Sequence, residues 1–385
     1  MRYVVLVPDG CADEPLPELH GRTPLEVAAM PHLAALASAA RSGARRSSRP
    51  ASPPGSDVGN LAILGYDPAR YHTGRAPIEA AAMGVELGPD EVAFRCNLVT
   101  VDDAGTMVDF AAGHPSDEQS HAIVAALDRV LGGDGVRFHP GVEYRHLVVL
   151  PRELADAECI PPHDLTGRRA VGPSGPAGPK LAALMEASRP VVREAAGRVG
   201  SRATQIWLWG QGVKPVLPAF RERYGLEGAL SSAVDLVRGL GVLTGLEVVD
   251  VPGATAGYDN DYGAQRDAGL ASLEDRPFFL LHVEATDEAG HQGDVEAKVS
   301  ALEAWDREVI GPMVAALTER GRFRLLLLPD HATPCTVRTH TAVPVPFLFV
   351  DSEVAGPGGR YCEASVAGSA PVAGHGLMAR LVAPA

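Results

Sequence analysis

Short apolar segments recur along the chain, and each ends in a polar or glycine-rich stretch. Residues 325–328 are apolar at every position, which is typical of strands covered on both faces of a parallel sheet. Helical patterns lie between such segments, and this alternation predicts a doubly wound α/β sheet. We expect strands at residues 3–8, 205–209, 246–251, 278–283, 324–328 and 345–350. We expect helices at residues 24–40, 226–240 and 295–310.

The middle of the chain has a different pattern. It contains two predicted strands (92–101 and 143–150), a predicted helix (116–131) and an exit rich in proline and glycine (172–179). A chain of 385 residues is long for a single domain. We therefore expect residues 87–190 to form an inserted, smaller α+β domain, and residues 1–86 and 191–385 to form the core. Residues 45–54, rich in proline, serine and arginine, are expected to form a loop.

Composition restricts the setting and the partners. Hydrophobic residues make up 46% of the chain and charged residues 21%, which is typical of a soluble globular protein. The formal net charge of −14 argues against a nucleic-acid partner, because phosphate backbones are bound by clustered Lys and Arg. No apolar stretch is long enough to span a membrane, and the apolar start is too short for a signal peptide. The five scattered cysteines contain no CxxC pair, so a reducing cytoplasm is the expected location.

Two segments near the N-terminus carry candidate chemical groups. Asp9 follows the first predicted strand, where it could also merely cap a turn. Ser56 precedes a helix predicted to begin near Val58, so it could be an ordinary N-cap. In the functional interpretation, the Ser56 hydroxyl lies in the positive field of the helix N-terminus and can carry a phosphate.

Three further segments add aspartate and histidine at predicted strand ends, where functional groups of such sheets gather. Asp287 and His291 follow the strand 278–283 and are four residues apart, so on a helical turn they share one face. Asp330 and His331 follow the strand 324–328, and as neighbours we expect them to point apart, toward more than one ion. His340 precedes the last predicted strand.

Together these residues predict a metal site. Mixed carboxylate and imidazole ligands suit Mn²⁺ or Zn²⁺ better than Ca²⁺, and Mg²⁺ stays open. Two such ions about 4 Å apart can activate an attacking oxygen and stabilise the leaving one during phosphoryl transfer. The residue pattern therefore favours a two-metal phosphoryl-transfer enzyme with Ser56 as the catalytic nucleophile.

The chain resembles the cofactor-independent phosphoglycerate mutases of the archaeal type, which are members of the alkaline phosphatase superfamily. The resemblance covers nearly the whole chain. It is carried by GSDVGNLAILGYDP (55–68), HTGRAPIEAAAMG (72–84), AFRCNLVTVD (93–102), IWLWGQG (206–212), HVEATDEAGHQGD (282–294), LLPDH (327–331) and RTHTAVPVPFLF (338–349). It implies an alkaline-phosphatase-like core.

The resemblance also implies roles for the candidate residues. One ion would be held by Asp287, His291 and His340, and the other by Asp9, Ser56, Asp330 and His331. Ser56 would take the phosphate from a small phosphorylated substrate and return it to another oxygen, interconverting 3- and 2-phosphoglycerate without added bisphosphoglycerate. The inserted domain would be a substrate-binding lid that excludes water, because an exposed phosphoserine would be hydrolysed. Whether identical chains assemble into a homo-oligomer stays open.

Cations are needed to bind the phosphate and the carboxylate of such a substrate. Lys214, Arg75 and Arg145 are candidates, and Lys298 lies seven residues after His291, which predicts the same helix face. Asn60 is a further candidate for substrate binding. For each cation, a solvated surface role stays open.

Several positions depart from the mutase pattern. Asn60 stands where the archaeal mutases typically carry His, and residues 110–114 lack the paired arginines expected there. Residues 144–146 and 161–164 look more like a subset of the family proposed to act as alternative homoserine kinases. Transfer of phosphate to homoserine or a similar amino acid is therefore the alternative function.

Overall fold

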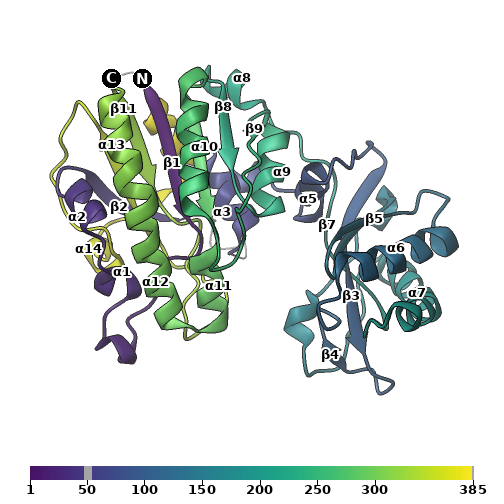
Figure 1. The fold of residues 1–385 in the computed structure, drawn as a ribbon. Coiled ribbons are helices and arrows are strands. Elements are labelled where there is room, and N and C mark those ends of the chain that lie inside the picture. The colour runs from purple at the N-terminus through teal and green to yellow at the C-terminus, as the bar shows by residue number, and fades with distance from the viewer. Residues whose placement is uncertain (47–53, 384–385) are drawn as a thin grey trace. The chain divides into compact units, whose positions relative to one another are not determined.

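The computed structural model describes residues 1–46 and 54–383, and it divides into two compact units (Figure 1). Unit 1 consists of Met1–His72 and Leu217–Ala385, and unit 2 consists of Thr73–Val216. Unit 2 therefore begins before the expected insert of residues 87–190 and ends after it. The extension has a packing reason, because α5 (Ala76–Ala82) and β7 (Gln205–Gly212) both pack against strand β3 (Glu91–Val101) of unit 2.

Unit 1 is built on one mixed sheet, which has eight strands among the described residues. β1 pairs in parallel with both β10 and β11, and the parallel run continues through β8 to β9. β12 runs antiparallel between β11 and β2. In spatial order the strands are β13 (Val372–Ala373), β2 (Arg41–Arg46), β12 (Val345–Asp351), β11 (Phe323–Leu327), β1 (Arg2–Pro8), β10 (Phe278–Val283), β8 (Gly228–Ser231) and β9 (Glu247–Val248). This sheet confirms the predicted α/β class.

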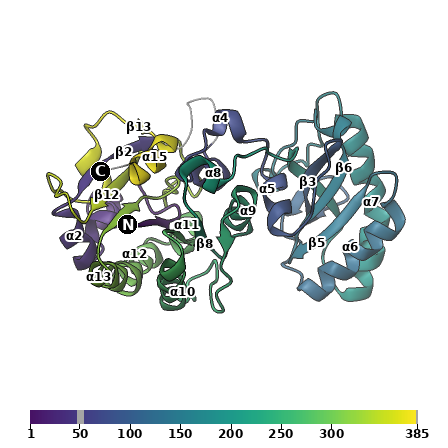
Figure 2. The same cartoon turned by 90° about the horizontal axis from the view of Figure 1, so that it is seen from above.

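Helices cover both faces of this sheet, and Figure 2 shows α10, α12 and α13 on one face and α15 on the other. The helical segments of unit 1 are η1 (Pro17–Leu19), α1 (Pro24–Val27), α2 (Pro31–Ala37), α3 (Ser56–Ile63), α4 (Pro68–Tyr71), α8 (Phe220–Tyr224), α9 (Asp235–Thr244), α10 (Tyr262–Asp275), α11 (Ala285–Gln292), α12 (Val295–Trp305), the π-helical η4 (Asp306–Ile310), α13 (Gly311–Glu319), α14 (Glu363–Val366), η5 (Gly374–Gly376) and α15 (Leu377–Val382).

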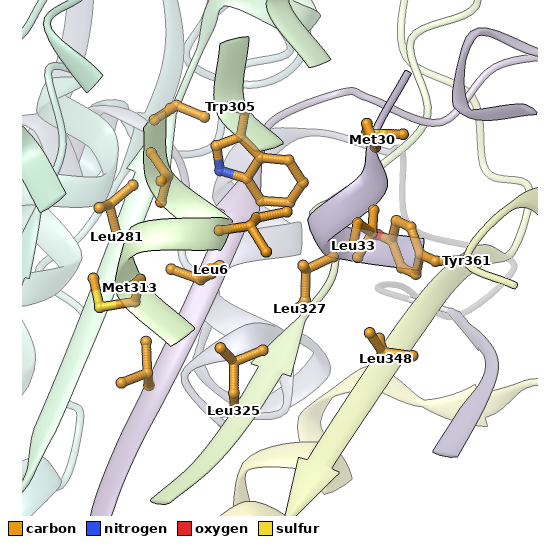
Figure 3. Close-up of a cluster of buried hydrophobic side chains, with 14 of the residues drawn as sticks. Leu6, Met30, Leu33, Leu281, Trp305, Met313, Leu325, Leu327, Leu348 and Tyr361 are labelled. Carbon is orange, nitrogen blue, oxygen red and sulfur yellow. The ribbon is translucent and has the colours of Figure 1, made fainter. Parts of the chain in front are cut away.

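The core of unit 1 explains why the central strands are apolar at nearly every position. Every residue of β10 and of β11 is buried, because each strand has packed neighbours on both faces. Figure 3 shows Leu6, Leu281 and Leu325 of three adjacent strands beside Trp305 of α12 and Met313 of α13. The strands are therefore fixed by burial, and the loops at their carboxyl ends are held at one edge.

Unit 2 contains a five-stranded sheet in which β3 lies between β6 and β7. Two long helices, α6 and α7, pack together and cover one face of it, while α5 packs on apolar residues of the other. The remaining elements of unit 2 are β4 (Met107–Asp109), α6 (Asp117–Leu131), β5 (Arg137–Val142), β6 (Arg145–Pro151), η2 (Arg152–Leu154), η3 (Pro162–Leu165) and α7 (Gly178–Val199).

Several predicted elements are wrong or shifted. The strand predicted at residues 205–209 exists, but as β7 it belongs to the sheet of unit 2. The helix predicted at 226–240 is wrong, because residues 228–231 pair with β10 and the helix begins only at Asp235. The helix predicted at 24–40 is divided, since Pro31 starts a new helix. Residues 45 and 46 of the predicted loop lie in β2, and residues 47–53 lie outside the described residues.

None of the described helices combines the length and the apolar character needed to cross a membrane.

Candidate metal centre

The predicted ligands come together at one edge of the sheet of unit 1. Asp9 directly follows β1, α11 begins two residues after β10, and Asp330 lies three residues after β11. Since β1, β10 and β11 are adjacent parallel strands, their carboxyl ends meet at the same edge. The N-terminus of α3 brings Ser56 to this edge, and the loop before β12 brings His340.

The first group of ligands is Asp287, His291 and His340. The Nε2 atom of His291 lies 3.1 Å from Oδ2 of Asp287 and 3.1 Å from Nε2 of His340. Nε2 of His340 lies 3.7 Å from Oδ1 of Asp287. One ligand atom of each residue can therefore be chosen so that all lie within 4.8 Å of one another. This convergence of a carboxylate and two imidazoles fits a divalent cation.

In this group the negative charge of the Asp287 carboxylate is balanced by a proton on His291. Burial alone raises the pKa of Asp287, but the hydrogen bonds from His291 and His340 outweigh it and hold this pKa well below its ordinary value. Burial lowers the pKa of His291, but the Asp287 carboxylate outweighs it and raises that pKa to about 9. Without a cation, His291 is therefore protonated at neutral pH, and a bound cation would displace that proton.

The second group is Asp9, Ser56, Asp330 and His331. Nε2 of His331 lies 3.0 Å from Oγ of Ser56 and 3.4 Å from both Oδ1 of Asp9 and Oδ2 of Asp330. The side chains of Asp9, Asp330 and His331 are fully buried. The two groups adjoin, because ligand atoms of Asp9, Asp287 and His331 also lie within 4.8 Å of one another.

Asp9 gives the clearest sign that these residues suit a cation. Its Oδ1 is buried and accepts no hydrogen bond from the described residues. Burial, together with the nearby charge of Asp330, raises the pKa of Asp9 well above its ordinary value. A buried carboxylate oxygen of this kind destabilises the fold unless a cation or a hydrogen-bond donor interacts with it. The residues present therefore fit metal ions at both groups.

Other residues hold the ligands in place. The Asn60 amide Nδ2 donates to Oδ2 of Asp330 at 2.9 Å and to the backbone oxygen of Ser56 at 3.0 Å. The hydroxyl of Thr333 donates to Oδ1 of Asp287. Gly59 allows α3 to approach closely, because a Cβ atom there would lie 2.7 Å from Cβ of Asp330. Asn60 is thus part of the centre, and its contact with substrate stays a prediction.

Two details of the sequence interpretation differ from the structure. The helix α3 begins at Ser56 with Gly55 as its N-cap, so the serine hydroxyl is directed to His331 and not to a backbone N–H group. Asp330 and His331 do not point apart. Nε2 of His331 lies 3.4 Å from Oδ2 of Asp330, while Oδ1 of Asp330 accepts hydrogen bonds from the backbone N–H groups of Gly10 and of His331 itself.

The sequence reasoning missed His282, which lies in β10 and is fully buried. Its Nε2 lies 2.9 Å from Oδ2 of Asp9, and its Nδ1 lies 3.0 Å from Oγ of Ser232. Burial lowers the pKa of His282 to about 4, so the ring is neutral. The available signal was a single histidine in an otherwise apolar strand.

Lys298 is not placed as predicted. Its ammonium group is fully buried and donates to Oδ2 of Asp13 at 2.8 Å and to the backbone oxygen of Thr333 at 2.8 Å. The seven-residue spacing from His291 fails, because α11 ends before Gly293 and Lys298 lies on the separate helix α12. Its donors are directed to the protein, which gives Lys298 a structural role in this fold.

The remaining predicted cations, Lys214, Arg75 and Arg145, belong to unit 2. Lys214 and Arg145 are exposed, and Arg75 is half-buried. Arg75 shares the carboxylate of Glu79 with Arg95, each at 2.8 Å. Although burial raises the pKa of Glu79, the two arginines outweigh it and lower that pKa. Arg95 is a cation that the sequence reasoning missed.

Comparisons with known proteins show which family this chain is similar to. A model of the 2,3-bisphosphoglycerate-independent phosphoglycerate mutase family matches residues 37–196. A curated protein of that name from Methanothrix thermoacetophila is 48% identical over 365 residues, which is 92% of this chain and 92% of that protein. Another of that name, from Methanosarcina acetivorans, is 43% identical over 93% of both chains.

Two solved structures are also similar over nearly the whole chain. A protein from Pyrococcus horikoshii has a TM-score of 0.81 at 26% identity, covering 99% of this chain and 97% of that one. A cofactor-independent phosphoglycerate mutase from Thermoplasma acidophilum has a TM-score of 0.61 at 26% identity, covering 99% of both chains.

Proposed function

The chain belongs to the family of 2,3-bisphosphoglycerate-independent phosphoglycerate mutases, and we propose that it interconverts 3-phosphoglycerate and 2-phosphoglycerate through a phosphoserine on Ser56. One observation carries this proposal: Oγ of Ser56 lies 3.0 Å from Nε2 of His331, beside the buried carboxylates of Asp9 and Asp330. A hydroxyl in that position is surrounded by the ligands of a cation.

Two divalent cations fit the proposed centre. Asp287, His291 and His340 would hold one, and Asp9, Ser56, Asp330 and His331 the other. Mixed carboxylate and imidazole ligands favour Mn²⁺ or Zn²⁺. When bound, these ions would supply positive charge that favours the ionised form of the Ser56 hydroxyl and neutralises the oxygens of the phosphate.

In the proposed reaction, Oγ of Ser56 attacks the phosphorus of 3-phosphoglycerate. The bond from phosphorus to the substrate oxygen breaks, and that oxygen takes up a proton in place of the one that the Ser56 hydroxyl gives up, which leaves phosphoserine and glycerate. The 2-hydroxyl of the glycerate then attacks the same phosphorus, and Ser56 is released with 2-phosphoglycerate. The N-terminus of α3 favours the negative charge on Ser56 at each stage, since its backbone N–H groups are partly positive.

The substrate also needs cations for its carboxylate. We infer that Arg75, Arg145 and Lys214 supply them, and that Arg95 fixes Glu79 and thereby the orientation of Arg75. Arginine binds carboxylate and phosphate through paired N–H groups, which suits an anion with fixed orientation. The homoserine-directed alternative is not favoured, because the relatives found carry the mutase name.

The test is to incubate metal-loaded protein with 3-phosphoglycerate and to follow products by phosphorus NMR. We expect 2-phosphoglycerate to form without added bisphosphoglycerate. Ser56→Ala should abolish transfer and phosphoserine formation, whereas Ser38→Ala, at an exposed position of unit 1, should behave as wild type. Near-normal turnover of Ser56→Ala would exclude the covalent route. Phosphohomoserine as the sole product, from homoserine and a phosphate donor, would exclude the mutase.

A further inference from the structure

His282 interrupts the apolar strand β10 at the position that pairs with Val7 of β1. Its side chain is fully buried. A buried polar group without a partner is destabilising, so a histidine in a central strand needs a structural or a functional reason. The partners of its two ring nitrogens supply one.

The hydrogen-bond partners fix which ring nitrogen carries the hydrogen. An aspartate that binds a cation is ionised, and its oxygens only accept, so Nε2 of His282 donates to Oδ2 of Asp9 across 2.9 Å. Nδ1 must then accept, and Oγ of Ser232 lies 3.0 Å from it. The Ser232 hydroxyl can donate its hydrogen to the ring while its oxygen accepts the backbone N–H of Val234 at 3.0 Å.

The same contact decides how Asp9 presents its carboxylate. The main chain of Asp9 is fixed on both sides, because its N–H donates to the oxygen of Val283 and its oxygen accepts the hydroxyl of Thr286. The side chain of Asp9 can still rotate, and the hydrogen bond from His282 to Oδ2 fixes that rotation. The other oxygen, Oδ1, is then directed toward Nε2 of His331 at 3.4 Å and accepts no hydrogen bond from the described residues.

We propose that His282 is a positioning residue, held by Ser232, that orients Asp9 so that Oδ1 faces the cation of the second ligand group. The inference rests on the proposed metal centre and deepens it. Partners of this kind, which touch a ligand and not the metal, typically change metal affinity by about 10–100-fold.

The test compares cation binding in three variants by titration calorimetry with Mn²⁺ and by metal analysis of dialysed protein. His282→Leu removes the donor, and we expect one of two Mn²⁺ sites to weaken by about 10–100-fold while the other stays within about twofold. His282→Gln should restore most of the affinity, because its amide nitrogen can donate to Asp9. Ser232→Ala should weaken the same site by a smaller factor, and the fold should tolerate it.

Ser231→Ala is the matched control, since this neighbouring buried serine contacts Gln265 and not the His282 ring. In turnover assays, His282→Leu should need more Mn²⁺ for half-maximal rate, while KM for 3-phosphoglycerate at saturating Mn²⁺ stays unchanged.

Unchanged Mn²⁺ binding in both His282→Leu and Ser232→Ala would overturn the positioning role. So would a third Mn²⁺ in the wild type that is lost in His282→Leu, because His282 would then be a ligand together with Asp9 and Asp330. If His282→Leu fails to fold, the Ser232→Ala titration decides. A wild-type chain that binds no cation would instead overturn the proposed function itself.

Discussion

Replacing Lys298 with methionine tests a buried ion pair that joins two ligand-bearing loops. Lys298 Nζ lies 2.8 Å from Oδ2 of Asp13 and 2.8 Å from the backbone oxygen of Thr333. Asp13 lies in the segment after β1, and Thr333 lies in the segment after β11. Methionine keeps the approximate length of the side chain but removes its charge and all three donors. The change therefore leaves the Asp13 carboxylate buried without its cation.

The expected loss follows from this burial. Breaking a buried ion pair by removing one partner costs about 3–5 kcal/mol, because the remaining charge is not compensated. The backbone N–H groups of Glu14 and Cys335 also donate to Asp13, so we expect a loss near the lower limit, about 3 kcal/mol. Asp13→Asn combined with Lys298→Met should cost less than the sum of the single changes, with a coupling of about 1–3 kcal/mol.

Urea unfolding measures these losses. Trp305 lies on α12 together with Lys298 and is buried, so its fluorescence reports on unit 1 once Trp207 and Trp209 of unit 2 are replaced by phenylalanine. A loss below about 1 kcal/mol in Lys298→Met, or strictly additive single losses, would refute the reasoning. A raised KM for phosphoglycerate with unchanged stability would show instead that Lys298 binds substrate, as the sequence alone suggested.

Two further substitutions test the centre and unit 2. Gly59→Ala places a Cβ atom 2.7 Å from Cβ of Asp330. The variant should lose about 1–3 kcal/mol of stability in urea unfolding and bind Mn²⁺ more weakly in calorimetry. Wild-type stability together with wild-type Mn²⁺ affinity would contradict the close approach of α3. Burial lowers the pKa of His146 to about 3. Below pH 6.5 the His146 side chain therefore becomes protonated in the unfolded chain but stays neutral in the folded chain. The stability of the folded chain falls as the pH falls toward 3. Between pH 6.5 and pH 5 this loss is about 2 kcal/mol. His146→Asn keeps an acceptor for the N–H of Gly141 and should remove that part of the pH dependence. Equal dependence of stability on pH in wild type and variant, measured by urea unfolding, would contradict this prediction.

The central strands could be predicted because they are buried on both faces. Phe278–Val283 is apolar at all positions except His282, and the structure gives the strand these same limits. The short strand β8 was missed for the opposite reason. Its four residues form a strand through pairing with β10, and the sequence around them also fits a helix. Similarly, β7 has a clear strand pattern, but only pairing with β3 decides that it belongs to unit 2.

The candidate ligands could be singled out because each lies beside a predicted strand or helix at a recognisable place. The hydrogen bonds that support them could not be predicted. His282 is 273 residues from Asp9, and Asn60 is 270 residues from Asp330, so no local pattern relates them. Lys298 shows the converse error, since a spacing that fits one helix fails when Gly293 ends α11 in a left-handed conformation.

The amino-acid sequence by itself determined the α/β class and the residue types that could bind cations, because burial and ligand chemistry act residue by residue. The order of β11, β1 and β10 in the sheet was decided only by tertiary packing. That order brings carboxylates distant in the chain to one edge. Which of their oxygens a cation can reach then depends on hydrogen bonds between those distant segments.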